Sequence, residues 1–374
     1  MPTTFTPTAG RRSGVTGLFT DQEYARQRAF FTTRVTPTPL VALPGLAARL
    51  GLGALWVKDE TRRFDLPAFK SLGVEFAVHE LTARGALAGV TTLVCASAGN
   101  HGRAVARAAR HAGLNARVFL DRDVSAARVE AIRSEAAEVV RVDGTYDDAV
   151  RLAADDAART GALVVSDTSW PGYELVPRDI MLGYTRVMDE AAAAWAGQGP
   201  PDLMIVQAGV GGLLAAVASW SARHLGDTRP ALVAVEPAFA ACVQASARAG
   251  APVAVAGPLT TIMAGLRCGE VSPLAFEVLA ELVDGYIAVE DHWCRAAMRR
   301  FAHPEPGDPA MVVGTSGAAG LAALLSATES AEARALFGTC APRAAPRVLL
   351  IATEGLTEPD LWRDVTGHTL VPSP

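Results

Sequence analysis

The stretch Leu203–Gly212, LMIVQAGVGG, places a run of apolar residues directly before a glycine-rich turn. A short apolar run that is bounded by turn residues is typical of a strand covered on both faces of a sheet. The same order of apolar run, turn and Ala-rich segment with helical period recurs along most of the chain. Strands and helices that alternate in this way predict a mostly parallel, doubly wound α/β fold.

Working outward from this stretch, similar patterns predict the other elements. Apolar, β-rich runs predict strands at Ala54–Val57, Thr91–Ala96, Ala116–Leu120, Glu138–Val142, Leu163–Ser166, Leu203–Gln207, Leu232–Glu236 and Val348–Ala352. Apolar residues with a period of about 3.6 residues predict helices. These lie at Leu43–Leu50, Phe69–Arg84, His101–Ala112, Ala126–Glu135, Tyr146–Arg159, Pro177–Ala194 and Gly212–His224.

Length and composition fit a globular protein of two domains, or of one large α/β body with a smaller lobe. The chain has 374 residues, 50% of them apolar and 20% charged, and a formal net charge of −5. This charge gives no electrostatic reason to expect a nucleic-acid partner. The sequence shows neither an apolar run of membrane-spanning length nor the apolar core of a signal peptide, so we expect a cytoplasmic protein without a membrane partner.

The cysteines and histidines do not follow a metal-binding pattern. The five cysteines stand far apart without a CxxC pair, and the seven histidines lack HExxH spacing. We therefore expect reduced, mostly buried thiols and no structural metal.

Three predicted strands end in turns that could carry chemistry. Ser97–Gly102 (SAGNHG), Ala208–Gly212 (AGVGG) and Thr353–Gly355 (TEG) each follow an apolar run directly. Ligands of doubly wound folds bind beyond the carboxyl ends of the strands. We therefore expect the three turns to line one crevice.

The turn Gly209-Val210-Gly211-Gly212 is a candidate phosphate site because it opens a predicted helix. Glycines let backbone N–H groups face a bound group, and the amino end of a helix favours negative charge. The turn is not a full GxGxxG motif, so a monophosphate is better supported than a dinucleotide. A tight turn with packing requirements alone is the simpler alternative.

Lysine is rare in this chain. Of its 34 basic residues, only Lys58 and Lys70 are lysines. A desolvated lysine can lose its proton and attack a carbonyl, whereas arginine keeps its charge. Lys58 lies among acids in WVKDE, where a solvated or paired ammonium is expected. Lys70 follows the apolar stretch Leu66–Phe69, which favours the neutral amine.

A lysine for a Schiff base and a glycine turn for one phosphate are the minimum equipment for pyridoxal 5'-phosphate. Four motifs then occur in order: Lys58-Asp59-Glu60, Phe69–Gly73, Ser97–Gly102 and Gly209–Gly212. Together they resemble the fold-type II pyridoxal-phosphate family, which includes threonine dehydratase, serine racemase and tryptophan synthase β. Within it, the chain is most similar to the diaminopropionate ammonia-lyases over about residues 30 to 362, through Asp167–Tyr173, Thr261–Leu266 with Cys268–Glu270, and Thr353–Gly355 with Pro359.

The resemblance implies a tryptophan synthase β-like architecture of two doubly wound three-layer domains with the cofactor in the cleft between them. Residues 1–86 and 172–374 would form the large cofactor-binding domain, and residues 87–171 the small domain. The family is usually homodimeric.

The resemblance also implies roles for single residues. Lys70, next to Phe69, would form the Schiff base and act as the base at Cα. Asn100 would bind the 3'-oxygen of the cofactor, and Gly209 to Gly212 would hold the phosphate. Thr353 would lie beside the pyridine nitrogen. The loop Ser97, Ala98, Gly99, Asn100 and His101 would hold the substrate carboxylate, although packing is the simpler expectation for His101.

Asp167 matches an aspartate that the ammonia-lyases bring near the distal amine of the substrate. A loop-capping role is the alternative, since Asp-Thr-Ser is also a common capping sequence.

Several positions depart from the ammonia-lyase pattern. Ala98 stands where these enzymes carry an aspartate that is thought to deprotonate the D-substrate, and an alanine cannot move a proton. We therefore predict action on the L-substrate alone. Asp65 and Pro67 replace Gly and Asn, Gly314–Gly317 lacks an expected glutamate, and Leu356 replaces an aspartate. The lost acids weaken the case for a diamine substrate, because a second ammonium requires nearby carboxylates.

The function predicted best is β-elimination from an L-α-amino acid, with L-2,3-diaminopropionate going to pyruvate and ammonia. The alternatives are a serine, threonine or hydroxyaspartate dehydratase and a biosynthetic β-replacement enzyme. A homologue that binds pyridoxal phosphate without catalysis is an alternative of another class.

Overall fold

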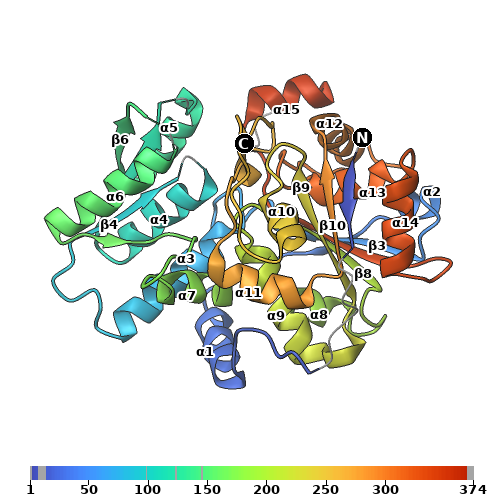
Figure 1. The fold of residues 1–374 in the computed structure, drawn as a ribbon, viewed down its shortest axis with the longest axis horizontal. Helices are drawn as coiled ribbons and strands as arrows, with labels where there is room; N and C mark the ends of the chain where they lie inside the picture. The colour runs from blue at the N-terminus through green and yellow to red at the C-terminus, as the bar shows by residue number, and fades with distance from the viewer. Residues whose placement is uncertain (1, 7–13, 98, 123, 145, 369–374) are drawn as a thin grey trace.

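The computed structural model describes residues 2–6, 14–97, 99–122, 124–144 and 146–368. The chain forms two sheets, each covered by helices (Figure 1). The smaller sheet and its helices lie at the left of Figure 1, the larger sheet lies at the right, and helices α3 (Lys70–Ala83) and α7 (Leu175–Tyr184) lie between them.

The large sheet has seven strands in the order β1-β10-β9-β8-β11-β3-β2. Its five central strands are parallel, while β1 and β2 pair antiparallel to their neighbours at the two edges. The strands are β1 (Thr3–Phe5), β2 (Leu40–Ala42), β3 (Ala54–Asp59), β8 (Leu203–Gln207), β9 (Ala231–Pro237), β10 (Gly285–Val289) and β11 (Arg347–Ala352).

The small sheet has four parallel strands in the order β6-β5-β4-β7. They are β4 (Thr92–Ala96), β5 (Asn115–Asp121), β6 (Glu138–Val142) and β7 (Leu163–Val164), joined by α4 (Asn100–His111), α5 (Ala126–Arg133) and α6 (Tyr146–Thr160). All of these elements fall within residues 87–171. The domain boundaries themselves stay a prediction.

Both faces of the large sheet are buried, as its apolar strands predict. In β9, Leu232 and Ala234 belong to one hydrophobic core, while Ala231, Val233 and Val235 belong to another. Successive side chains of a strand point to opposite faces, so the two cores lie on opposite sides of the sheet.

Separate groups of helices complete the two cores. Those that share the core of Leu232 are α1 (Asp21–Thr32), α3, α7, α8 (Arg186–Trp195), α9 (Gly212–Leu225), α10 (Cys242–Ala249) and α11 (Pro273–Leu282), together with α4 and α5 of the small sheet. Those that share the core of Ala231 are α2 (Pro44–Arg49), α12 (Asp291–Ala302), α13 (Ala319–Ser326), α14 (Ala331–Cys340) and α15 (Pro359–Thr366).

The structure confirms the doubly wound α/β fold and corrects two details of the sequence prediction. Strands β1, β2 and β10 and helices α1 and α10 to α15 were not predicted. The predicted helix Pro177–Ala194 is two helices, α7 and α8, which meet at Thr185. The Thr185 hydroxyl donates to the carbonyl of Leu182 at 2.6 Å, and such local bonds compete with a continuous helix.

A buried cluster of charges lies beneath the segment that leads to Lys70. The Lys58 Nζ lies 3.1 Å from Glu60 and 2.8 Å from Glu190, and the Arg63 guanidinium contacts the same two carboxylates at 2.5 and 2.7 Å. All four side chains are at most 2% exposed. The partly buried Arg186 adds a contact to Glu190 at 2.8 Å. We call Lys58, Glu60, Arg63 and Glu190 the charge cluster.

Asp65 lies at the tip of a tight turn on the surface. Arg63 and Leu66 exchange backbone hydrogen bonds of 2.8 and 3.0 Å across it, and Phe64 and Asp65 between them have φ of 51° and 63°. The Asp65 side chain is 76% exposed and pairs with the equally exposed Arg62 at 3.2 Å. Asp65 therefore faces solvent rather than a binding pocket.

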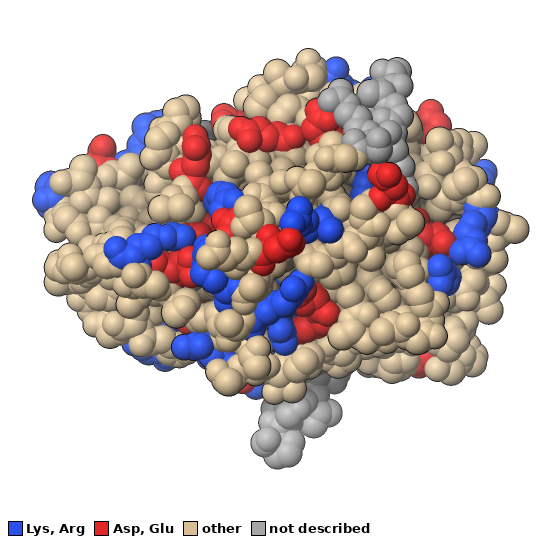
Figure 2. All heavy atoms as spheres, turned by 90° about the horizontal axis from the view of Figure 1, so that it is seen from below, with Lys and Arg blue, Asp and Glu red and all other residues tan. Residues whose placement is uncertain are grey.

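The surface does not gather charge of one sign on the face shown in Figure 2, where basic and acidic side chains are interspersed. Among the helices of the described residues, none is both long and apolar enough to cross a membrane. The same residues contain no group of three or more His, Cys, Asp or Glu side chains that could hold a metal ion.

We predict that Glu190→Gln lowers the free energy of unfolding by about 3–5 kcal/mol, because it leaves Lys58 and Arg63 buried with the Glu60 carboxylate alone. Burial would raise the pKa of Glu190, but its bonds to Arg63 lower that pKa from 4.5 to about 2. The stabilisation is therefore complete above pH 4.5 and lost as the pH falls towards 2.

Urea unfolding of both proteins as a function of pH tests this. The exposed Glu130→Gln serves as the matched control and should change stability by no more than about 0.5 kcal/mol. A difference between wild type and Glu190→Gln that stays constant down to pH 2 would contradict the assignment.

Candidate active site

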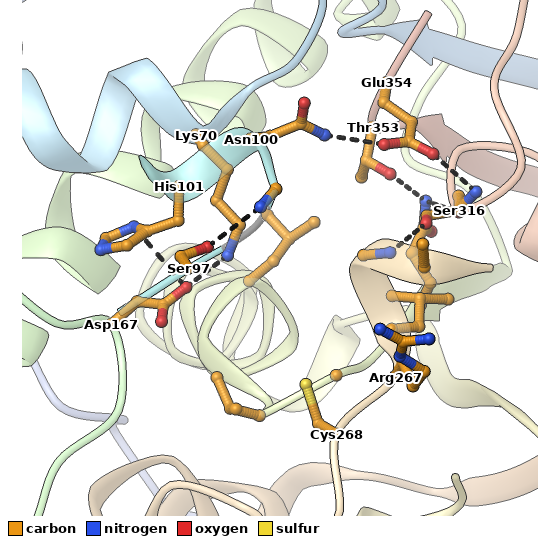
Figure 3. A pocket seen from close by; sticks show the side chains of 18 of the residues that line it. Lys70, Ser97, Asn100, His101, Asp167, Arg267, Cys268, Ser316, Thr353 and Glu354 are labelled. Carbon is orange, nitrogen blue, oxygen red and sulfur yellow. Dashed lines mark hydrogen bonds and ion pairs between the residues drawn. The ribbon is translucent and has the colours of Figure 1, made fainter. Parts of the chain in front are cut away.

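One pocket lies where the carboxyl ends of strands from both sheets meet (Figure 3). The turns after β4, β8 and β11 all contribute to it, as the sequence predicts. Its lining contains Phe69, Lys70, Ser97, Gly99, Asn100, His101, Asp167, Gly209, Val210, Gly211, Gly212 and Thr353. These are all of the residues predicted for the site except Ala98, which lies outside the described residues.

The glycine turn lies between β8 and the first residue of α9, so it presents backbone N–H groups at the amino end of a 14-residue helix. Gly211 has φ of 95°, a left-handed conformation that favours glycine. A Cβ atom added at Gly211 would approach a methyl carbon of Leu279 to 2.9 Å, and one at Gly209 would approach the Cys268 Sγ to 3.0 Å. The turn has the geometry of an anion site.

Lys70 is the first residue of α3 and points into the pocket (Figure 3). Its Nζ lies 2.5 Å from Oδ2 of Asp167, and the rings of Phe69 and Tyr184 lie 5.4 and 5.6 Å from it. The Lys70 and Asp167 side chains are 22% and 17% exposed. The ion pair joins the start of α3 to the segment that follows β7 of the small sheet.

The electrostatics of this pair correct the expectation of a neutral lysine. Burial alone would lower the pKa of Lys70, but the Asp167 carboxylate outweighs burial and raises that pKa above its usual value. In the same way, burial would raise the pKa of Asp167, but the Lys70 ammonium holds it below its usual range. With this pairing, Lys70 is an ammonium at neutral pH.

Lys58, the other candidate lysine, is excluded from this chemistry. Its side chain is fully buried in the charge cluster and is not among the residues that line the pocket. The expected paired ammonium is confirmed, and it is not solvated.

Asn100 and His101 occupy the first turn of α4. The Asn100 amide Nδ2 donates to Oε2 of Glu354 at 2.7 Å. The His101 Nε2 lies 2.9 Å from the carbonyl oxygen of Val165, so this nitrogen carries a proton that it donates. The His101 Nδ1 lies 3.8 Å from Asp167 Oδ2.

Thr353 lies directly after β11 and accepts a 2.7 Å hydrogen bond at Oγ1 from the Gln207 amide. Gln207 is the last residue of β8, so this bond joins two strand ends. A hydroxyl that accepts one hydrogen bond can still donate its own hydrogen. Thr353 is therefore suited to bind an unprotonated ring nitrogen.

Sequence reasoning placed Glu354 in a turn that lines the pocket but gave it no role, and it missed Arg128. Glu354 is 4% exposed and accepts from the Ser316 backbone at 2.8 Å in addition to Asn100. Its place in Thr-Glu-Gly after a strand was a usable signal. Arg128 of α5 pairs with Glu358 beside α15 at 3.2 Å, which links the small and large sheets at the pocket. Such a contact between distant segments leaves no local pattern in the sequence.

Comparisons with known proteins point to one family of enzymes. A family described as pyridoxal-phosphate dependent enzyme matches residues 31–340. The diaminopropionate ammonia-lyase of Escherichia coli K12 is 34% identical over 96% of both chains, and that of Salmonella typhimurium LT2 is 37% identical over 88% of both. The crystal structure of the E. coli enzyme with an aminoacrylate-PLP azomethine intermediate has a TM-score of 0.89 at 32% identity, covering 98% of this chain and 96% of that one.

The pocket fits pyridoxal 5'-phosphate, the cofactor that these similarities imply. The Lys70 amine, the glycine turn and the Thr353 hydroxyl, which suit an aldehyde, a phosphate and a ring nitrogen, all line it together. The close contacts at Gly209 and Gly211 leave little room for a side chain at these two positions of the turn.

We predict that Asp167→Asn accelerates uptake of pyridoxal phosphate by the cofactor-free protein about tenfold or more at neutral pH. Without the carboxylate, burial lowers the pKa of Lys70 and more of its amine is neutral and reactive. For the wild type, uptake should rise about tenfold per pH unit between about pH 7 and pH 9.

The uptake rate follows from growth of the absorbance band near about 410–420 nm. The exposed Asp227→Asn is the matched control and should behave as wild type. Uptake by Asp167→Asn that is no faster than wild type would show that Asp167 does not control the lysine.

Proposed function

Because this chain belongs to the family of pyridoxal-phosphate-dependent enzymes, we propose that it is a lyase that converts L-2,3-diaminopropionate to pyruvate and ammonia. The observation that carries this proposal is the Lys70–Asp167 pair, with 2.5 Å between Nζ and Oδ2. It places an amine able to act as a base beside a carboxylate able to bind a second ammonium. The similarity to diaminopropionate ammonia-lyases over nearly the whole chain supports the same conclusion.

When bound, pyridoxal phosphate supplies an electron-accepting ring that stabilises the charge left at Cα. The glycine turn and the amino end of α9 hold the phosphate through backbone N–H groups. Asn100 binds the 3'-oxygen, and Thr353 donates its hydroxyl hydrogen to the ring nitrogen. The amino end of α4, with Ser97 and Gly99 before it, binds the substrate carboxylate.

The reaction begins when the Lys70 amine removes the Cα proton. Asp167 binds the distal ammonium and keeps it protonated, so the β-carbon–nitrogen bond breaks with its electrons going to nitrogen and ammonia leaves. The remaining three-carbon enamine takes up water and yields pyruvate and a second ammonia. One diaminopropionate and one water therefore give one pyruvate and two molecules of ammonia.

We further propose that the enzyme acts on the L-isomer alone. Lys70 lies on one side of the pocket, and Ala98 stands where an ammonia-lyase would carry the second base. The homodimer and the cytoplasmic location, expected from the family and the sequence, are part of this proposal.

A screen for keto-acid release tests the proposed substrate. L- and D-2,3-diaminopropionate, L-serine, L-threonine and O-acetyl-L-serine are compared on the purified enzyme. We expect L-diaminopropionate to be turned over fastest and its D-isomer at least about 100-fold more slowly, because a positioned base contributes about 10²–10⁴-fold. Comparable turnover of the D-isomer would refute the L-specificity. Faster release from serine or threonine would favour a dehydratase, and product formed only with an added nucleophile would favour β-replacement.

Lys70→Ala tests the cofactor assignment. We expect this variant to lose both keto-acid release and the absorbance band near about 410–420 nm that the lysine-bound cofactor gives. Lys58→Ala would disturb the charge cluster, so Lys70→Arg, which keeps the charge beside Asp167, is the better control for folding. A band that persists in Lys70→Ala would exclude this lysine. A wild-type band that no amino acid perturbs would favour the non-catalytic alternative.

A further inference from the structure

The His101 imidazole is a buried group with an unused acceptor in the active site. The side chain is 5% exposed and lines the pocket next to Asp167 (Figure 3). Its Nε2 is engaged with the Val165 carbonyl at 2.9 Å. Among the described residues, Nδ1 has no hydrogen-bond partner. Buried polar atoms normally have partners, so an unpaired one in a binding pocket calls for an explanation.

The hydrogen bond at Nε2 fixes which nitrogen carries the proton. A carbonyl oxygen can only accept, so Nε2 must donate to Val165. In the neutral ring, Nδ1 is then an acceptor with a free lone pair. Burial lowers the pKa of His101, which keeps the ring neutral at neutral pH.

Nδ1 faces the carboxylate that is proposed to bind the distal ammonium. It lies 3.8 Å from Asp167 Oδ2, the atom that the Lys70 ammonium contacts at 2.5 Å. Two acceptors cannot bond to each other, so they have no direct attraction at this distance. A single ammonium in the pocket can donate to both, because it carries three hydrogens.

The Asp167 carboxylate can pair with such an ammonium when Lys70 carries no charge. Once Lys70 is bound to the cofactor or acts as a neutral base, the Asp167 carboxylate has lost its nearest cation. A second ammonium from the substrate restores that pairing and also satisfies Nδ1. The site thereby compensates for the acids that the sequence lacks relative to other ammonia-lyases.

We propose that His101 is a specificity-determining residue, whose Nδ1 accepts a hydrogen bond from the distal ammonium of the substrate while Asp167 binds the same group. The proposal rests on the proposed function, because it requires a 2,3-diamino acid in the pocket. It also separates amines from alcohols. A serine hydroxyl has one hydrogen and can donate to Asp167 or to His101, but not to both.

Two substitutions separate the two ring nitrogens. In His101→Gln, the side-chain amide reaches the position of Nε2 and keeps a donor for Val165, but the acceptor at the Nδ1 position is lost. In His101→Asn, the shorter amide places an oxygen near the Nδ1 position and keeps the acceptor. His111 lies on the same helix at 45% exposure, so His111→Gln is the matched control.

We expect His101→Gln to raise the KM for L-2,3-diaminopropionate about 10- to 100-fold, as expected for a lost hydrogen bond to a charged group, with a much smaller change in kcat. The KM for L-serine should change by less than about threefold, since serine does not need both acceptors. His101→Asn should recover most of the affinity for diaminopropionate, and His111→Gln should match wild type. The cofactor absorbance band of each variant shows that the site is intact.

The preference for diaminopropionate over serine, taken as the ratio of their kcat/KM values, decides the proposal. If this ratio in His101→Gln stays within about threefold of wild type, or if kcat/KM falls equally with both substrates, the proposal is overturned. His101 would then have a role in packing only. If the wild-type enzyme releases no pyruvate from diaminopropionate, the proposed function itself fails, and that outcome is recognised before any variant is compared.

The protonated nitrogen gives a test that does not depend on turnover. In protein labelled with ¹⁵N-histidine, the signals lost in His101→Gln identify this ring. Their shifts should report a proton on Nε2 and none on Nδ1 at neutral pH. A proton on Nδ1 would overturn the proposal, because that nitrogen could not accept.

Discussion

The charge cluster fixes the segment that carries Lys70. Glu60, directly after β3, and Glu190 on α8 hold Arg63 from one side, and Lys58 pairs with the same two carboxylates. On the other side, the backbone N–H of Phe69 donates to the Thr353 carbonyl at 3.2 Å, and that of Gly355 donates to the Pro67 carbonyl at 2.9 Å. Because buried ions that lose a partner are costly, movement of this segment away from the charge cluster would cost free energy. The amine at the start of α3 is therefore positioned before any ligand binds.

The same anchoring couples the three turns of the active site. Thr353 and Glu354, which follow β11, lie next to the anchored segment. Thr353 bonds to Gln207 at the end of β8, and Glu354 bonds to Asn100 after β4. The Glu354–Asn100 bond crosses from the large sheet to the small sheet, so both sides of the cleft share one hydrogen-bond network. Groups locked by packing and by such bonds are the ones that can hold a reacting geometry.

The sequence predicted features that depend on neighbouring residues. It failed for features that depend on contacts with residues far away in the chain. Apolar strands followed by glycine or polar turns could be recognised without the structure, and these turns do line the pocket. The edge strands β1 and β2, of three residues each, are defined by antiparallel pairing with distant strands and have too little pattern of their own. The neutral amine expected for Lys70 was wrong because Asp167, 97 residues away, dominates its environment. From the sequence alone, Asp65 could not be assigned to either the pocket or the surface, because only the backbone geometry of the turn directs its side chain to solvent.

The contrast between the two lysines explains why one is structural and the other reactive. Both contact carboxylates at 2.5–3.1 Å, so ion pairing alone does not distinguish them. Lys58 shares two carboxylates with Arg63 in a fully buried cluster and is not among the residues that line the pocket, so it is not placed to meet a ligand. Lys70 has one carboxylate, in a pocket that a substrate can enter, and an incoming ammonium can replace it beside Asp167. Lys70 can thus give up its charge without leaving Asp167 unpaired, and the acceptor at His101 favours substrates that bring a second amine.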